Sequence, residues 1–272
     1  MTKAMRGAPA ATDNAPRWSQ VVGRSASQNE LPPADAVADA VRAAAQQASA
    51  PVDLNSVLRQ WPGLRVSIED LDGTGYLLDL GQRGGEILLR SRDSRGRRRF
   101  TLAHELGHWL LGAPAVPPHV GGHDSPRVER WCEEFSVNLL LPRAWLAEDV
   151  ERLKTRPHLA RHLARLPKRY GVSRAAALRR VAEVSDVSIF LRDWTQPRGV
   201  LAACFVSDQP GPARDLVALK RWAENLTVPL GESEPRAVGG ALVVSSAFIA
   251  DRSETLIASF PRREAQQNPT PA

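Results

Sequence analysis

The chain has 272 residues, of which 43% are hydrophobic, and its formal net charge is +6. That length allows one large domain or two smaller ones, with enough apolar residues to form a core. The sequence has no apolar run long enough to span a membrane and no N-terminal secretory signal. Its two cysteines, Cys132 and Cys204, predict no disulfide framework. We therefore expect a soluble, cytoplasmic protein that does not associate with membranes.

The positive charge is concentrated in one segment of the chain. Residues 152–180 carry ten basic side chains and no acidic one, and subtracting these ten charges from +6 leaves −4 for the rest. Any hypothesis that the protein binds nucleic acid must therefore concern this segment.

The first third of the chain predicts two helices and three strands. Residues 1–33 lack periodicity, and we expect them to be disordered. An alanine-rich run between Pro33 and Ala50 favours a helix, and Asp53 is a typical N-cap for a short second one. Glycine turns then separate three β-like segments, at residues 64–70, 75–80 and 86–91.

The middle of the chain predicts mostly helices. The basic stretch Arg95–Arg99 leads into a helix expected from about Thr101 to Leu111. A loop rich in proline and glycine follows, and a second long helix is predicted over about 126–141. Further helical segments are expected at about 143–165 and 173–184. Beyond them the sequence predicts four strands, at 187–194, 199–208, 241–250 and 254–260, and one helix at about 213–226.

This change of pattern predicts a domain boundary near Val184. We expect an α+β protein with a mainly helical domain and a small β-sheet at 34–184. A small α+β C-terminal domain would occupy 185–263, and the tail at 264–272 would be disordered. Cys204 lies in an apolar strand and is expected to be a core residue, so nothing in 185–263 indicates a chemical role.

The chemically informative residues are the sequence HELGH, residues 104–108. On a helix, His104 and His108 lie one turn apart on the same face and can bind one metal ion at about 2.0–2.1 Å. Glu105 is then placed to take a proton from a water molecule on that metal, as in zinc peptidases. The alternative is a solvated helix with two surface histidines. The apolar neighbours favour a buried metal site: Leu102, Ala103, Leu106, Trp109, Leu110 and Leu111.

A catalytic zinc ion usually has three protein ligands, so one more is required. The predicted helix at 126–141 supplies three carboxylates, Glu129, Glu133 and Glu134. Glu129 and Glu133 share one helix face, whereas Glu134 points about 100° away from Glu133. Either Glu129 or Glu133 could be the ligand, and the other could hydrogen-bond to a ligand histidine.

Two segments resemble the ImmA/IrrE family of metallopeptidases. The first is RRFTLAHELGH, residues 98–108, and the second is the downstream helix, where the family pattern is E-x-x-A-x-x-F-A-x-x-L-L-x-P. This chain has Cys132 and Ser136 where the family has alanine, which keeps the volume small. Residues 170–181 also resemble the short helix that follows in the family, so the resemblance covers about 55–181.

The resemblance implies a zincin-like catalytic domain with one zinc ion per chain. It identifies Glu129 as the third ligand and places Glu133 where related zinc peptidases orient a ligand histidine. Members of the family cleave helix-turn-helix repressors of phages, mobile elements and DNA-damage responses. The expected function is therefore a zinc-dependent endopeptidase that cuts such a transcriptional repressor in a stress or mobile-element response.

The substrate of such an enzyme is expected to lie extended along an edge strand, and residues 86–91 are the candidate strand. The transition state needs one further hydrogen-bond donor. The sequence leaves this donor open among Tyr76, His119, His123, His158 and Tyr170.

Several features have competing interpretations. His158 and His162 form a second i, i+4 pair, but a solvated helix face is favoured over a second metal site. The loop containing His119 and His123 could be a lid or a plain connector. Residues 170–181 also resemble half of a helix-turn-helix, which raises the hypothesis that the protein binds nucleic acid directly. The favoured interpretation is a helix that packs on the catalytic domain. A third possibility is that this basic segment docks an acidic partner. The alternative overall function is a zinc-stabilised regulatory or DNA-binding protein without peptidase activity.

Overall fold

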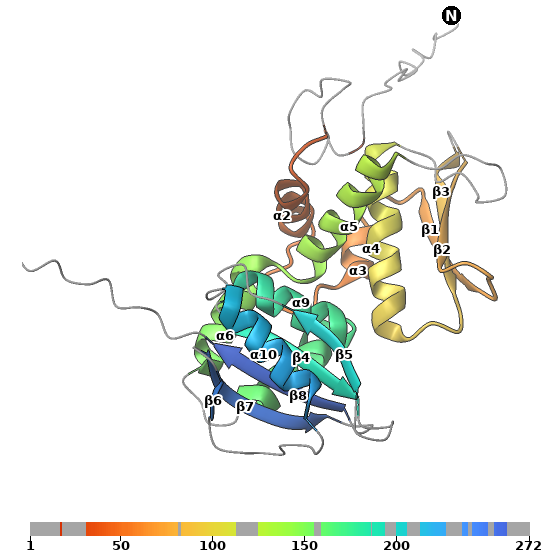
Figure 1. Ribbon diagram of the computed structural model, residues 1–272. Helices are drawn as coiled ribbons and strands as arrows, with labels where there is room; N and C mark the ends of the chain where they lie inside the picture. Colours follow the sequence, from red (N-terminus) through yellow and green to blue (C-terminus); the bar gives the residue numbers. More distant parts are fainter. Residues whose placement is uncertain are drawn as a thin grey trace, which may run out of the picture.

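In a computed structural model, the first half of the chain combines helices with a three-stranded sheet, and the last part contains a five-stranded sheet (Figure 1). Two separate sheets and nearby helices confirm the predicted α+β class. The predicted disorder of 1–33 and 264–272 falls almost entirely on residues outside the described ones. The structure describes Arg17 and residues 31–80, 83–112, 125–154, 159–185, 187–193, 200–205, 213–226, 236–238, 241–249 and 253–259.

The N-terminal elements match the predicted helices and strands closely. Helix α2 spans Ala34–Ala44, and α3 spans Leu54–Leu58, where the Asp53 side chain accepts a hydrogen bond from the Asn55 amide. Strands β1 (Leu64–Glu69), β2 (Gly75–Asp79) and β3 (Gly85–Arg90) form the small sheet.

The order of strands in this sheet corrects one prediction. The order is β1-β3-β2, with β3 parallel to β1 and antiparallel to β2. Because both edges of β3 are already hydrogen-bonded, the segment 86–91 cannot receive an extended substrate as an edge strand. Strands β2 and β3 form a hairpin, and β2 lies at an edge of the sheet.

Helix α4 (Arg95–Leu111) begins six residues before the predicted start at Thr101. The Ser94 hydroxyl caps it by accepting a hydrogen bond from the Arg97 amide at 3.3 Å. Since arginine favours helices, the basic stretch Arg95–Arg99 forms the first turns of α4 instead of preceding it. Helix α5 spans Pro126–Leu140, and α4 lies between α5 and the small sheet (Figure 1).

The region predicted as one helical segment at 143–165 is divided. Helices α6 (Arg143–Lys154) and α7 (Leu159–Leu163) are separate, and α8 (Leu166–Tyr170) and α9 (Arg174–Val184) follow. The sequence places Pro157 between α6 and α7, and proline removes a helical hydrogen bond.

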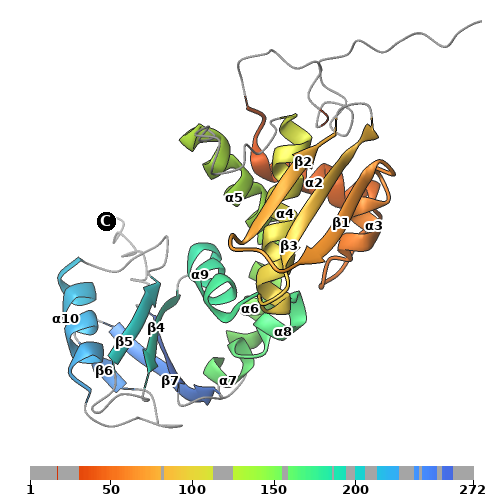
Figure 2. The same cartoon turned by 90° about the vertical axis from the view of Figure 1, so that its right-hand side faces the viewer.

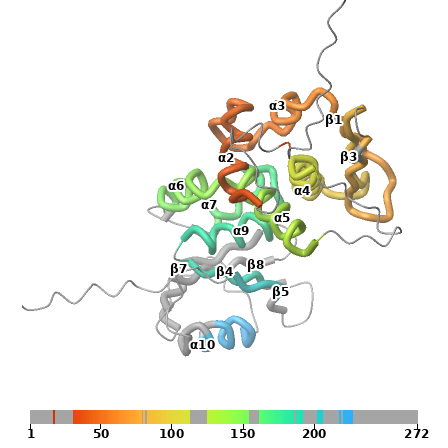
Figure 3. Tube along the Cα trace, turned by 90° about the horizontal axis from the view of Figure 1, so that it is seen from above, coloured from red at the N-terminus to blue at the C-terminus, as the bar shows by residue number. Residues whose placement is uncertain are grey.

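The C-terminal sheet is fully antiparallel, in the order β5-β4-β8-β7-β6. Helix α10 covers one face, and α7 and α9 lie on the other (Figures 2 and 3). The short strand β6 was not predicted. The strands and helix are β4 (Val187–Asp193), β5 (Val200–Phe205), α10 (Ala213–Glu224), β6 (Arg236–Val238), β7 (Ala241–Ile249) and β8 (Ser253–Ser259).

The sheet therefore starts just after the predicted boundary at Val184, although α7 and α9 from the preceding region pack on it. The division into domains stays a prediction. Within the described residues, no helix is both long enough and apolar enough to cross a membrane.

Candidate metal centre

The close packing of α4 against α5 positions the centre. A Cβ atom on Gly107 would lie only 3.1 Å from the Sγ of Cys132 and 3.2 Å from its Cα, so the two helices touch at these small residues. The Trp131 indole fixes α5 by donating a hydrogen bond to the Pro32 carbonyl at 2.6 Å, and its ring stacks on Phe135. This packing brings Glu129, one turn before Cys132, beside the HELGH segment of α4.

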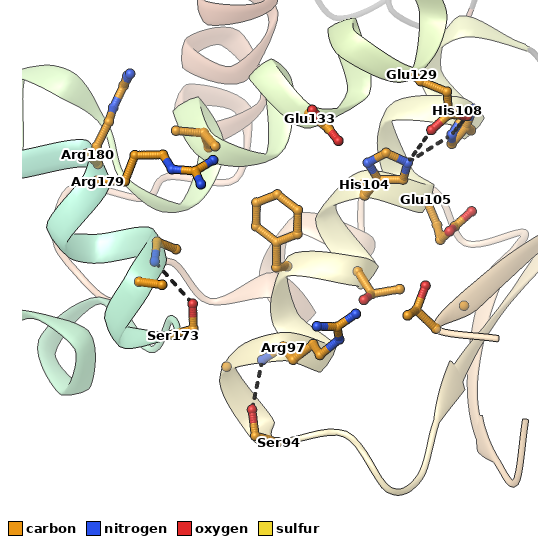
Figure 4. A pocket seen from close by; sticks show the side chains of 18 of the residues that line it. Ser94, Arg97, His104, Glu105, His108, Glu129, Glu133, Ser173, Arg179 and Arg180 are labelled. Atoms are coloured by element: carbon orange, nitrogen blue, oxygen red, sulfur yellow. Dashed lines mark hydrogen bonds and ion pairs between the residues drawn. The ribbon is translucent and has the colours of Figure 1, made fainter. Parts of the chain in front are cut away.

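The three predicted ligands converge on one point. The Nε2 atoms of His104 and His108 are 3.2 Å apart, and they lie 3.2 and 3.3 Å from the Glu129 carboxylate oxygens (Figure 4). Ligands at about 2.0–2.1 Å from a tetrahedral zinc ion are about 3.3 Å from one another. His104 approaches one oxygen of the Glu129 carboxylate and His108 the other, and these separations are close to those that a zinc ion requires. Two imidazoles with one carboxylate are also a donor set that zinc prefers.

Within the part of the chain that the structure describes, these three residues are the one group of histidine, cysteine and acidic side chains close enough to hold a metal. His162 belongs to no such group, and its predicted partner His158 lies outside the described residues. The favoured interpretation of that pair, a solvated helix face, therefore stays a prediction.

Burial keeps His108 in the protonation state that binds metals. His108 is only 2% exposed, and burial, together with the neighbouring His104, lowers the pKa of His108 to about 4. Its imidazole is therefore neutral at physiological pH, which is the form that coordinates metals. The side chains of His104 and Glu129 are more open, at 18% and 44% exposed, so the centre faces a cleft on one side.

Glu105 lies beside the three potential ligands, on the side of α4 that faces β2 (Figure 4). Its side chain is 6% exposed and lines the same cleft as His104 and His108. Strand β2 passes close by: a Cβ atom on Gly75 would collide with the Thr101 methyl group and lie 3.6 Å from Glu105 Oε1. The absence of a side chain at residue 75 therefore lets the edge strand approach the carboxylate.

The cleft has a volume of about 910 Å³ and extends well beyond the metal centre. Thr74 and the first residues of β2, Gly75 and Tyr76, line it, and α4 and α5 provide its floor and one wall. Helix α9 provides the opposite wall, including Arg179 and Arg180, which the sequence did not indicate as site residues. The signal that could have indicated them is the pair of adjacent arginines near the end of residues 170–181, the segment that resembles the short helix of the family.

Other predicted site residues have mixed outcomes. Glu133 lines the cleft, but it is exposed and makes no hydrogen bond or ion pair within the described residues, so its role in orienting a histidine stays a prediction. Tyr170 is wrong as a transition-state donor, because it is fully buried and its hydroxyl donates to Asp149 at 2.8 Å. Burial and Asp149 raise the pKa of Tyr170. His119 and His123 lie outside the described residues. Tyr76 lines the cleft, but its neighbour Gly75 is the position of β2 that faces Glu105, and the Tyr76 hydroxyl lies beside Gly73, on the other face of the strand.

Comparison with known proteins identifies relatives. Residues 60–182 match the family of IrrE N-terminal-like domains. The chain is 35% identical over 111 residues to the radiation response metalloprotease IrrE of Deinococcus radiodurans, covering 38% of this chain and 32% of that protein. It is 33% identical over 154 residues to the protein of the same name from Deinococcus deserti, covering 51% and 50%. The chain thus spans half or less of the length of these curated relatives.

Among solved structures, the chain aligns with a Mycobacterium tuberculosis transcriptional regulator. It is 14% identical in sequence and has a TM-score of 0.48, and the alignment covers 86% of this chain and 78% of that one.

Proposed function

Residues 60–182 of this chain belong to the ImmA/IrrE family of metallopeptidases, and from this premise we propose that the protein is a zinc-dependent endopeptidase. The observation that carries the proposal is the convergence of the His104, His108 and Glu129 donor atoms beside the Glu105 carboxylate, in one cleft. The finer proposal is that it cuts one peptide bond in a specific protein, a helix-turn-helix transcriptional repressor.

The metal would be held by the three ligands, and Glu105 would handle protons. A zinc ion in this position would supply Lewis-acid chemistry, because zinc lowers the pKa of bound water and polarises a carbonyl group. Glu105 accepts the proton of the attacking water and delivers it to the leaving amine. Its 6% exposure keeps bulk water from competing for that proton.

Strand β2 is the proposed binding edge for the substrate backbone. One edge of β2 pairs with β3, and within the described residues no strand pairs with its other edge. An extended peptide added to that edge would pass Gly75 and bring a peptide bond toward Glu105. This replaces the sequence-based proposal of residues 86–91.

The identity of the substrate rests on relatives and on family resemblance. Both curated relatives carry the name radiation response metalloprotease, which supports a role in a stress response. The resemblance at residues 98–108 and 129–142 supports a helix-turn-helix repressor as the target. We therefore propose that cleavage relieves transcriptional repression under stress or in the response of a mobile element.

The test is cleavage in cells that co-produce the chain with helix-turn-helix repressors encoded near it. Wild-type protein should generate site-specific fragments of one repressor, and Glu105→Gln should generate none while retaining about one zinc per chain. Glu134→Gln is the matched control, because Glu134 is an exposed carboxylate on α5 outside the cleft, and this variant should cleave normally.

Two results would reject the proposal. Cleavage by Glu105→Gln would remove the assigned proton acceptor. A zinc-loaded wild-type protein that binds a repressor or DNA but cuts nothing would support the non-enzymatic alternative, a zinc-stabilised regulatory protein.

A further inference from the structure

The half of the cleft away from the metal centre is lined by two exposed arginines from different helices. Arg97 comes from α4 and Arg179 from α9, and both line the cleft that contains His104. Figure 4 shows Arg179 on the α9 side of this space and Arg97 on the α4 side, with Glu133 and His104 further along. Arginine forms paired hydrogen bonds with carboxylates, so two of them in a substrate cleft indicate a preference for acidic groups.

A direct contact between α4 and α9 sets the positions of these arginines. A Cβ atom on Gly96 would lie 2.8 Å from the carbonyl carbon of Val172 and 3.0 Å from the Ser173 nitrogen, so the two helices begin against each other. Their capping residues, Ser94 and Ser173, both line the cleft. The arginines therefore project from two helices whose first turns are in contact.

The guanidinium groups of Arg97 and Arg179 have donors to offer, unlike that of the neighbouring Arg180. Arg180 is engaged with the Glu183 carboxylate at 2.9 Å and with Asn138 Oδ1 at 2.6 Å, and its side chain is 11% exposed. Arg97 uses only its Nε for an ion pair with Asp93, at 3.4 Å, and its side chain is 61% exposed.

Arg179 is also exposed, with its guanidinium carbon 5.8 Å from the Phe205 ring centre. Among the described residues it forms no ion pair. It can therefore meet a ligand without first breaking a salt bridge.

The distance along α4 gives the position of the acidic group in a substrate. Seven residues separate Arg97 from His104, which at about 1.5 Å per residue is about 10 Å. An extended peptide advances about 3.3 Å per residue, so this distance corresponds to about three substrate residues. Glu133, between the metal centre and Arg179, would repel an acidic side chain placed closer to the scissile bond.

We propose that Arg97 and Arg179 form a specificity subsite for an aspartate or glutamate about three residues from the scissile bond of the substrate. This inference rests on the proposed peptidase function, because it assumes that the cleft holds an extended peptide. It explains why basic side chains from residues 152–180 reach into the cleft at α9.

The test measures binding of short peptide hydroxamates to the zinc-loaded protein by calorimetry. The hydroxamate binds zinc, and the attached residues then lie along the cleft. In one series of peptides they extend to one side of the metal, and in a second series they extend to the other side. Each peptide carries glutamate, glutamine or lysine at the second, third or fourth position from the hydroxamate. Acetohydroxamate, which has no peptide, reports on the metal centre alone.

We expect the glutamate peptide to bind about tenfold more tightly than the glutamine peptide at the third position of one series, as one charged hydrogen bond provides. Arg97→Ala and Arg179→Ala should each remove most of this difference, and Arg179→Glu should reverse the preference toward lysine. Arg179→Lys should keep part of it. The matched control Arg165→Ala removes an exposed arginine of the same basic segment outside the cleft and should change nothing.

The outcomes separate the two proposals. Equal affinities for glutamate and glutamine peptides at every position, with normal acetohydroxamate binding, would overturn the subsite and leave the peptidase function intact. A protein that binds neither zinc nor acetohydroxamate would overturn both.

Discussion

Replacing Gly107 with alanine should weaken the metal centre more than it weakens the fold. The added methyl group would lie 3.1–3.2 Å from the Sγ, Cα and Cβ atoms of Cys132, so α5 must move by a few tenths of an ångström. Alanine gains about 1 kcal/mol of helix propensity over glycine, and overpacking costs about 1–3 kcal/mol. The free energy of unfolding should therefore fall by about 0–2 kcal/mol.

Zinc affinity should be the more sensitive quantity. Glu129 lies one turn from Cys132 and moves with it, and the donor distances of 3.2–3.3 Å are already close to those of a tetrahedral site. Metal sites tolerate displacements of about 0.2 Å, so we expect a loss of at least tenfold in zinc affinity.

The assay is competition for zinc with a chromophoric chelator, alongside denaturant unfolding of the metal-free protein. Gly107→Val provides a graded comparison and should lose more affinity than Gly107→Ala, because it adds two further methyl groups at the same contact. If Gly107→Ala were about 1 kcal/mol more stable than wild type and kept its zinc affinity, the close approach of α4 and α5 would not position the ligands.

Three further predictions use other parts of the site. Gly75→Ala pushes on the Thr101 methyl group at the edge of β2 and should slow repressor cleavage while zinc content stays near one per chain. Tyr170→Phe removes the hydrogen bond to buried Asp149 and should lower the free energy of unfolding by about 1–2 kcal/mol, seen in urea, without affecting zinc binding. In metal-free protein the folded-state pKa of His108, about 4, lies below its unfolded value of 6.5, so the unfolded state binds more protons between these values. The free energy of unfolding should therefore keep its full value above pH 6.5 and fall by up to about 3 kcal/mol as the pH drops toward 4. A His108→Gln variant that shows the same decrease would contradict the assignment of this pH dependence to His108.

Local sequence signals predicted the helices well, whereas the pairing of strands that are distant in sequence was harder to predict. The HELGH spacing and apolar residues that recur every three to four positions predicted α4 and α5, because a helix is determined by neighbours three and four residues apart. The sequence-based start of α4 lies too late in the chain, because Ser94 caps a helix that begins with a run of arginines.

The substrate edge shows why the sheet was harder to predict. Residues 86–91 precede the metal helix in sequence, which suggested an edge strand near the site. Their place between β1 and β2 depends on the parallel pairing of Leu64 with Gly85, and nothing local to either strand specifies it. Gly75 carried a usable signal, because a glycine in a strand often marks a close approach of another element.

The site itself was predictable only where one helix contained it. His104, Glu105 and His108 follow from spacing, whereas the residues alone left Glu129 and Glu133 as alternatives and the family resemblance favoured Glu129. The structure places Glu129 at the histidines and leaves Glu133 further along the cleft. The wall formed by α9 joins the site through the contact of Gly96 with Val172 and Ser173, far away in sequence.

The most direct test of the metal centre is the X-ray absorption spectrum of the zinc-loaded protein. We predict two imidazole nitrogens and carboxylate and water oxygens, all at about 2.0–2.1 Å, with the carboxylate contribution lost in Glu129→Ala. A sulfur ligand at about 2.3 Å, or a spectrum that His104→Ala and Glu129→Ala leave unchanged, would contradict the centre on which the proposed activity depends.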